Sequence, residues 1–356
     1  MTRIREIMIR ENRIIIALLG VLTVIAIGFV LYQIRSIVLP FALAVFISYV
    51  LNPVIQFFEK RKVPSILAIL LALIITFLVL NLFGVLVYTS ISSFASEFPK
   101  YSDRIGVLLN NVLDFLNIPR EILSGGWKSG EGFQLLDSIR DLSLHRLILN
   151  TLGSVLNFVS NSLLVLLFLL FILIGRNQLI RKVQVAFEAE TAMRIAGMLK
   201  NMNRQIQRYL IAKGSTSLAT GLLFFIILSL FGVEFAIIWG LLTFLLNFIP
   251  NIGSVIATIL PLLIAFIQFG SLGTLFWLAL LLSGIQMVIG NFIDPRVVGR
   301  SVNLSPLVVL CSLMFWGWLW GFIGMFLAVP ISVIIKIVFE NTRSLKFMSI
   351  LMSHSS

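Results

Sequence analysis

Long uncharged stretches separated by short polar gaps dominate the pattern of this 356-residue chain. They cover residues 14–34, 36–58, 63–96, 147–175, 214–233, 235–293 and 301–335. A helix needs about 20 apolar residues to cross a bilayer core of about 30 Å, and a backbone in lipid must satisfy its own hydrogen bonds. A membrane β-barrel would show a series of short strands with alternating polarity, and this sequence has no such series. The pattern therefore predicts an all-α, polytopic transmembrane helical bundle.

The last two stretches predict broken helices. Residues 235–293 are interrupted by Pro250-Asn251-Ile252-Gly253 and again by Gly270-Ser271-Leu272-Gly273. The first two pieces are short for a full crossing, so they fit either a re-entrant hairpin or two short packed helices. The stretch 301–335 is long for one span and contains several glycines and prolines. We expect about seven or eight membrane segments, some of them broken or re-entrant.

Composition supports the membrane class. Hydrophobic residues make up 59% of the chain and charged residues 12%. Soluble domains contain about 45–50% apolar residues and about 25% charged residues. The single cysteine, Cys311, excludes an intrachain disulfide scaffold. The 30 phenylalanines and the mean hydropathy of +1.06 exclude a disordered chain.

The positions of the cations predict the orientation. Basic residues gather before residue 14 and in the segment 176–213, whose last cation is Lys213. The positive-inside rule places both regions in the cytoplasm. The basic face of 177–212 fits anionic lipid headgroups, and it carries no motif for nucleic acid. The first apolar stretch has no cleavage site after it, so we interpret it as an anchor and not a signal peptide.

The same patterns divide the chain into consecutive segments. The segment 97–146 is nearly neutral and carries apolar residues at helical spacing, so amphipathic helices outside the bilayer are expected there. They either pack on the membrane domain or form a substrate lid. The predicted division is 1–96 (N-terminal transmembrane segments), 97–146 (extracytoplasmic amphipathic helical segment), 147–175 (transmembrane segment), 176–213 (basic cytoplasmic helical segment), 214–340 (C-terminal transmembrane segments with broken helices) and 341–356 (cytoplasmic tail).

The motifs of common enzymes are absent from the sequence. It contains no P-loop, no H-E-x-x-H zinc motif and no G-x-S-x-G nucleophile motif. Its two histidines, His145 and His354, stand alone. The sequence therefore predicts no enzyme, no catalytic residues, no cofactor and no metal site.

Polar groups in the broken helices are the candidates for a transport path. Broken helices expose backbone groups that can bind a solute at membrane depth. Asn247 lies one turn before Asn251, Pro250 leaves a carbonyl one turn back unpaired, and Gly253 allows close approach. The alternative is an interfacial turn between two spans.

Asp294-Pro295 closes the longest uncharged stretch. Gln286 and Asp294 are eight residues apart on one helix face, with Gly290 between them and Asn291 nearby. An ionisable group at membrane depth is a functional candidate, here as a carrier of protons or cations. The alternative is structural, because Asp before Pro is a usual N-cap and would open a short helix at 295–300.

Small and basic residues in the last stretch predict packing and anchoring. Gly317, Gly321 and Gly324 would allow helix backbones to approach, within the chain or between subunits. Arg35 and Lys336 stand at the ends of apolar stretches, where long basic side chains reach the headgroups.

Several motifs occur in the order of a known family. They are Leu39-Pro40, Leu51-Asn52-Pro53, Tyr209-Leu210 with Gly214, Asn247 to Gly253, Asp294-Pro295-Arg296-Val297-Val298-Gly299-Arg300, Pro306, the three glycines 317, 321 and 324, and Ala328-Val329-Pro330. In this order the chain resembles the autoinducer-2 exporter (AI-2E) family of bacterial multi-pass membrane proteins. Asp294 stands where we expect an acid, although many relatives have Glu.

The resemblance implies a homo-oligomeric transporter in the plasma membrane, the inner one where a cell has two. Membrane lipid and a small solute or cation would be its partners, with no nucleic acid. We therefore predict a secondary transporter that exports a small polar solute such as autoinducer-2. Alternating access would pivot on residues 247–254 and 286–300. Some relatives are associated with sodium or lithium exchange against protons, so such an antiporter is one alternative, and an uncoupled pore or scaffold is another.

Overall fold

A computed structural model describes residues 18–20, 22–23, 25–115, 144–176, 178–297, 303–342 and 345–353. Its regular elements within these ranges are all helices, so the predicted all-α class is confirmed. They are α2 (Arg35–Lys60), α3 (Ser65–Phe115), α6 (Leu144–Gly175), α7 (Gln178–Ala186), α8 (Ala189–Leu230), α9 (Ala236–Leu246), α10 (Ile252–Phe269), α11 (Leu272–Met287), the π-helix η1 (Val288–Ile293), α12 (Asp294–Val297), α14 (Pro306–Asn341) and α15 (Lys346–Met352).

Among the described residues, six helices are long and apolar enough to cross a membrane. They are Arg35–Lys60, Ser65–Thr89, Ala189–Leu230, Ile252–Phe269, Leu272–Val297 and Pro306–Asn341. Three shorter apolar helices accompany them: Leu18–Gln33, Val159–Gly175 and Ala236–Leu246. Many large apolar side chains lie on the surface of these helices, as lipid contact requires. The predicted polytopic bundle is confirmed, and the number of seven or eight segments stays a prediction.

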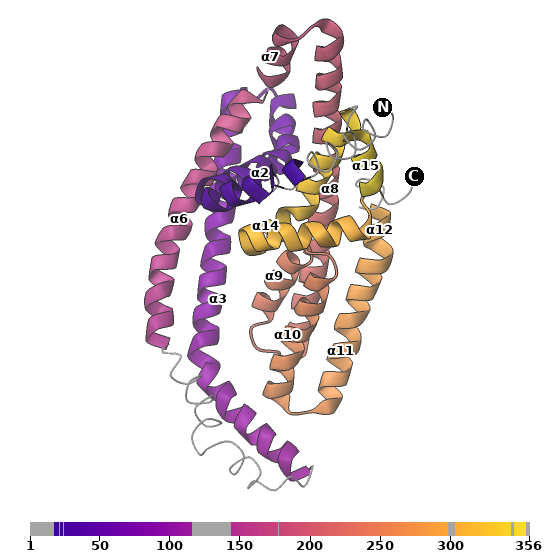
Figure 1. The fold of residues 1–356 in the computed structure, drawn as a ribbon. Coiled ribbons are helices and arrows are strands. Elements are labelled where there is room, and N and C mark those ends of the chain that lie inside the picture. Colours follow the sequence, from indigo (N-terminus) through magenta and orange to yellow (C-terminus); the bar gives the residue numbers. More distant parts are fainter. Residues whose placement is uncertain are drawn as a thin grey trace, which may run out of the picture.

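The N-terminal part is a bundle of α2, α3 and α6, which lie on one side of the molecule (Figure 1). Its core contains several alanines, among them Ala44, Ala68 and Ala72, which bring the helices close around Leu169. The α3 helix is unbroken as far as Phe115, so the first amphipathic stretch of the predicted segment 97–146 continues a membrane helix. Residues 116–143, which hold much of that segment, lie outside the described residues.

The basic segment and the following apolar stretch form one continuous helix. The segment predicted as basic and helical, 176–213, forms α7 and the first part of α8, with Phe187 and Glu188 between them. The α8 helix then continues to Leu230 without a break. The predicted boundary between residues 213 and 214 therefore lies inside a helix.

Helices α9 and α10 pack as a helical hairpin, which fits both forms predicted for this stretch, a re-entrant hairpin and two short packed helices. Gln268 ties its two open ends together, because its side-chain oxygen accepts from the Glu234 N–H (2.9 Å) and its amide nitrogen donates to the Gly232 carbonyl (2.8 Å). At 11 residues, α9 is only about 16 Å long. The hairpin closes at residues 247–251, which we call the α9–α10 tip.

A glycine contact packs this hairpin against α8. A Cβ atom on Gly221 would lie 2.6 Å from the Gly240 carbonyl oxygen, and one on Gly240 would lie 2.8 Å from the Gly221 carbonyl oxygen. Only glycine at both positions lets α8 and α9 approach this closely. The core beside this seam is formed by Phe224, Leu228, Leu278 and Leu282.

The long helix α14 is bent back on itself at Gly321, which has φ +64° and ψ −144°. Its two arms, 306–320 and 322–341, run side by side: the Ser312 hydroxyl donates to the Ala328 carbonyl (3.1 Å), and a Cβ on Gly324 would lie 1.9 Å from the Trp316 carbonyl oxygen. Gly317 faces Met325 in the same seam. Gly317 and Gly324 therefore lie in a contact within the chain, and Gly321 forms the bend between the two arms.

Lys336 does not reach outward from the second arm of α14. Its side chain is buried, and Nζ donates to the Asn303 carbonyl at 2.6 Å, with Glu340 3.6 Å away. The prediction that Lys336 reaches the headgroups is wrong, because this contact ties the open end of the α14 hairpin. Arg35 lies over the ring of Tyr32, 4.7 Å from its centroid.

Candidate functional site

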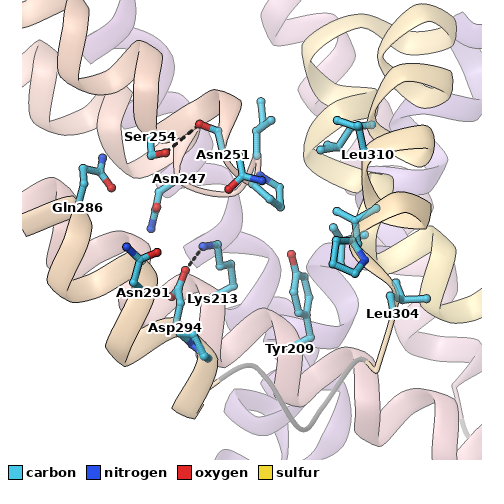
Figure 2. A pocket seen from close by; sticks show the side chains of 18 of the residues that line it. Tyr209, Lys213, Asn247, Asn251, Ser254, Gln286, Asn291, Asp294, Leu304 and Leu310 are labelled. Carbon is cyan, nitrogen blue, oxygen red and sulfur yellow. Dashed lines mark hydrogen bonds and ion pairs between the residues drawn. The ribbon is translucent and has the colours of Figure 1, made fainter. Parts of the chain in front are cut away.

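A polar cavity of about 650 Å³ lies between α8, the α9–α10 tip, α14 and the continuous helix formed by α11, η1 and α12, which we call the α11–α12 rod. Figure 2 shows the amide and charged side chains on one side of it and apolar residues of α14 on the other. Seven of the predicted path residues line it: Asn247, Pro250, Asn251, Gln286, Asn291, Asp294 and Pro295. Gly253, the eighth, does not line it and lies just behind the tip. The structure thus brings two segments about 40 residues apart in sequence, 247–251 and 286–295, to one space.

The α9–α10 tip is held on two sides. Asn247 is buried, and its amide nitrogen donates to the Ser217 hydroxyl of α8 at 3.2 Å. The ring of Phe248 lies 4.4 Å, centroid to centroid, from that of Phe326 in α14. These contacts fix the tip between α8 and α14, so its polar groups have a defined position in the cavity.

The backbone of the tip makes a strained turn at Asn251. This residue has φ +62° and ψ −57°, and the Ile252 N–H donates to the Pro250 carbonyl at 2.7 Å. That geometry is a γ-turn of the rare positive-φ form. Gly253 follows with no room for a side chain, because a Cβ there would lie 1.8 Å from the Leu246 carbonyl oxygen. Strain of this kind tends to gather at functional sites.

The opposite wall is one helical rod in which α11 passes through η1 into α12. The π-helix contains Asn291 and lies between Gln286 of α11 and Asp294 of α12, all three of which line the cavity. Such π-helical bulges are frequent at functional sites. Asp294 has helical dihedral angles, φ −53° and ψ −48°, inside this rod. An N-cap residue has non-helical angles, so the interpretation of Asp294 as the cap of a helix at 295–300 is wrong.

Asp294 instead forms an ion pair with Lys213 of α8, as Figure 2 shows. The Lys213 Nζ lies 2.5 Å from Oδ2 of Asp294, and the two side chains are only 8% and 17% exposed. The other carboxylate oxygen, Oδ1, is buried and has no hydrogen-bond partner in the described part of the chain. The same holds for Nε2 of Gln286. The wall therefore offers one unused acceptor and one unused donor.

Sequence reasoning missed Lys213 and Tyr209, which both line the cavity. Lys213 was counted with the cytoplasmic cations of α8, yet the spacing separates it from them. Lys200, Arg204 and Arg208 follow at intervals of four and are exposed, whereas Lys213 comes five residues later and is buried. Tyr209, Lys213 and Ser217 form their own stripe at intervals of four, and this stripe was the signal available.

The cavity has the chemistry of amides, hydroxyls and one ion pair. Across the described residues, no group of three or more His, Cys, Asp or Glu side chains could hold a metal ion. The only other titratable side chain on its described lining is the Tyr209 phenol. Such a site can bind a polar solute or a monovalent cation, and it offers no nucleophile with an adjacent base.

The chain is similar to a known protein family over most of its length. Residues 19–344 match the model of a family described as AI-2E family transporter. The chain belongs to the AI-2E transporter family. The predicted resemblance is confirmed, and the match includes both hairpins and every residue named above as lining the cavity.

Three similar proteins align with most of the chain. The AI-2 transport protein TqsA of Escherichia coli K12 is 34% identical over 343 residues, with 95% of each chain covered. A Haemophilus influenzae protein is 35% identical over 336 residues, with 91% of this chain and 92% of that protein covered. A Borreliella burgdorferi protein is 30% identical over 317 residues, with 89% and 84% covered. The names of all three are those of transport proteins, so this AI-2E member is a multi-pass membrane protein of a transporter class and not of an enzyme class.

Proposed function

We propose that the polar cavity is the solute site of a secondary transporter that exports a small polar solute, with autoinducer-2 as the first candidate. The observation that carries the proposal is the convergence of the α9–α10 tip and the α11–α12 rod on one cavity. Its volume lies in the range of about 300–1,000 Å³ that is usual for small-molecule sites. The relative named as an AI-2 transport protein supports the choice of solute.

The unused polar atoms of the rod favour a hydroxyl-bearing solute. A solute with several hydroxyl groups can accept from Gln286 Nε2 with one of them and donate to Asp294 Oδ1 with another. The amides of Asn251 and Asn291 add further donors and acceptors around it. The apolar wall from α14, including Leu310 and Leu313, contacts the carbon face of such a solute.

Access alternates between the two sides of the membrane when the α9–α10 tip and the α11–α12 rod move apart and together. The strained turn at Asn251 is the place where the tip can change its backbone. Broken helices around a central site are a recurring design in secondary transporters. The seam of Gly221 and Gly240 keeps α9 on α8, so the larger movement falls to the rod.

Counterflow in liposomes tests this proposal. Liposomes that contain the purified protein are loaded with unlabelled autoinducer-2 and diluted into a trace of labelled autoinducer-2. A carrier produces a transient overshoot of label inside, and Gln286→Leu abolishes it, whereas Gln184→Ala on exposed α7 does not. Equilibration without an overshoot would identify an uncoupled pore, and no flux at all would leave a scaffold.

Exchange of sodium or lithium against protons is a second candidate, because Asp294 Oδ1 is an unused anionic ligand. Labelled sodium uptake into acid-loaded liposomes measures it directly. We expect Asp294→Asn to abolish the pH-dependent uptake. An unchanged pH profile in that variant would exclude Asp294 as the carrier.

We further propose a homo-oligomer in the plasma membrane with a cytoplasmic N-terminus. The oligomer is tested by mass measurement of the protein in lipid nanodiscs. The orientation is tested by protease access to an N-terminal tag in inside-out vesicles. A monomeric mass or a protected tag would contradict these proposals.

A further inference from the structure

Lys213 pairs with only one of the two carboxylate oxygens of Asp294. Its ammonium group approaches Oδ2 of Asp294 from α8, and Oδ1 of the same carboxylate has no partner among the described residues. Both side chains line a cavity with room for them to move. The four-carbon stem of lysine is flexible, so the ammonium can leave the carboxylate without a backbone change.

A purely structural clasp explains this pair less well. A buried ion pair adds little net stability, because desolvation of two charges offsets their attraction. Other contacts already hold α8 in place. Ile206 packs against apolar residues of α14, and Gly221 packs against Gly240 of α9. The pair borders the cavity, and Asp294 directly follows the π-helix η1, a feature that is frequent at functional sites. This position favours a role in which the pair forms and breaks.

No other fixed charge among the described residues lines the cavity. The α9–α10 tip contributes amides and a proline, α10 contributes the Ser254 hydroxyl, and α14 contributes apolar side chains. Tyr209, from α8, is the remaining titratable group that faces Asp294. The net charge of the described lining, with the pair formed and the phenol neutral, is therefore zero.

We propose that Lys213 is a tethered counter-cation, which competes with a monovalent cation such as Na⁺ or Li⁺ for the carboxylate of Asp294. This rests on the second candidate of the proposed function, exchange of sodium or lithium against protons at the same cavity. In the empty site, the ammonium neutralises Asp294. In the loaded site, the metal cation lies at the carboxylate and Lys213 is displaced.

Charge and protons balance in this exchange. When the cation binds, the displaced ammonium releases one proton to water in the cavity and becomes a neutral amine. When the cation leaves, the amine takes one proton from water and pairs again with Asp294. One cation is exchanged for one proton, and the net charge of the site stays at zero in both states.

The competition makes a quantitative prediction for cation affinity. The apparent Kd equals the intrinsic Kd divided by the fraction of protein in which the carboxylate is free of Lys213. Lys213→Gln removes the competitor, so it should lower the Kd for Na⁺ by at least about tenfold. Lys213→Arg retains a charge that cannot be released, because the guanidinium stays protonated, so it should raise the Kd by at least about tenfold.

The experiment is binding of radioactive Na⁺ to the purified full-length chain at pH 8.5, with increasing unlabelled NaCl. The expected order of affinity is Lys213→Gln, then the unaltered protein, then Lys213→Arg, with no saturable binding in Asp294→Asn. Arg208→Gln, which changes an exposed cation on the same helix, serves as the matched control and should leave the Kd unchanged. Equal affinities in the two Lys213 variants, or saturable binding in Asp294→Asn, would overturn the proposal.

Two features keep this test decisive. If Lys213→Gln does not fold, as judged by gel filtration, Lys213→Arg still tests the proposal alone through its predicted loss of affinity. The measurement needs no solute, so failed counterflow of autoinducer-2 would contradict the proposed export and leave the sodium affinities to be judged by themselves.

Discussion

The hydroxyl oxygens of Ser312 and Ser332 lie 2.6 Å apart, although the two serines stand on opposite arms of α14. Both are buried, and the carbonyl of Ala328 accepts from each of them. This small polar group joins the arms below the bend at Gly321. At this point the two arms of α14 are joined by neutral hydrogen-bonding groups and not by charged side chains.

A double-mutant cycle should reveal this contact. Ser312→Ala and Ser332→Ala should each lower the free energy of unfolding by about 0.5–1.5 kcal/mol. Their effects should not add, because both remove the same contact, and the interaction energy should be about 0.5–1 kcal/mol. Chemical unfolding of the detergent-solubilised protein measures it, with exposed Ser215→Ala as control. Strictly additive losses would show that the hydroxyls do not interact.

Gly321→Ala should destabilise the bend of α14. At φ +64° and ψ −144° an alanine is strained by about 1–3 kcal/mol. The matched control is Gly284→Ala in α11, where a Cβ meets no atom within 4 Å and the residue is helical; there alanine should be neutral or stabilising. Thermal unfolding in one detergent compares the two. An equal melting temperature for both variants would mean that residue 321 is not held in this conformation.

The two hairpins show what could and could not be predicted from sequence. The helical class followed from the length of the apolar stretches, because a backbone of that length in lipid must form its hydrogen bonds internally, as a helix does. The break at Pro250 was visible as a motif, and two forms stayed open because composition does not show whether a chain turns back. The bend at Gly321 was read as helix packing, since a glycine with positive φ has the same sequence signature as one that fits a close contact.

Asn251 should separate the conformation of the tip from its chemistry. Asn251→Gly keeps a residue that adopts φ +62° without strain, so the fold should be as stable as before. It removes an amide from the cavity, so counterflow of autoinducer-2 should fall several-fold. Asn251→Ala should lose both stability and transport. Full transport by the glycine variant would show that this amide does not contact the solute.

Asp294→Asn should destabilise the protein as well as affect transport. It leaves the buried Lys213 ammonium without its carboxylate, at a cost of about 3–5 kcal/mol. The double variant Lys213→Met with Asp294→Leu removes both charges and should recover most of that stability, while transport stays absent. Unfolding and counterflow measured on the same preparations give the comparison. A double variant as unstable as the single one would contradict the pairing.

Gln268→Ala should loosen the open end of the α9–α10 hairpin. It removes the bonds to Gly232 and Glu234 that tie the two ends together, and each is worth about 0.5–1.5 kcal/mol. Amide hydrogen exchange of residues 231–235 should become faster, while exchange in α3 stays unchanged. Identical exchange in the variant would mean that other contacts hold this end.

The candidate site was predictable in part, for a definite physical reason. Asn247, Gln286 and Asp294 were visible because polar groups are rare in long uncharged stretches. Lys213 was not recognised, because it stands at the edge of a basic segment and its partner is a carboxylate 81 residues later; the stripe that it forms with Tyr209 and Ser217 shows its face but not that partner. The π-helix also left no signal, since its extra residue per turn has no characteristic composition.

The neutrality of the Lys213–Asp294 pair has an electrical consequence. Moving one elementary charge across a membrane held at 100 mV changes the energy by about 2.3 kcal/mol, but a pair whose charges sum to zero couples to that voltage only weakly. The empty transporter can then reset at nearly the same rate in an energised and in a de-energised cell. With Gln at position 213, an ionised Asp294 would carry one uncompensated charge through the field, and the resetting step would become sensitive to voltage.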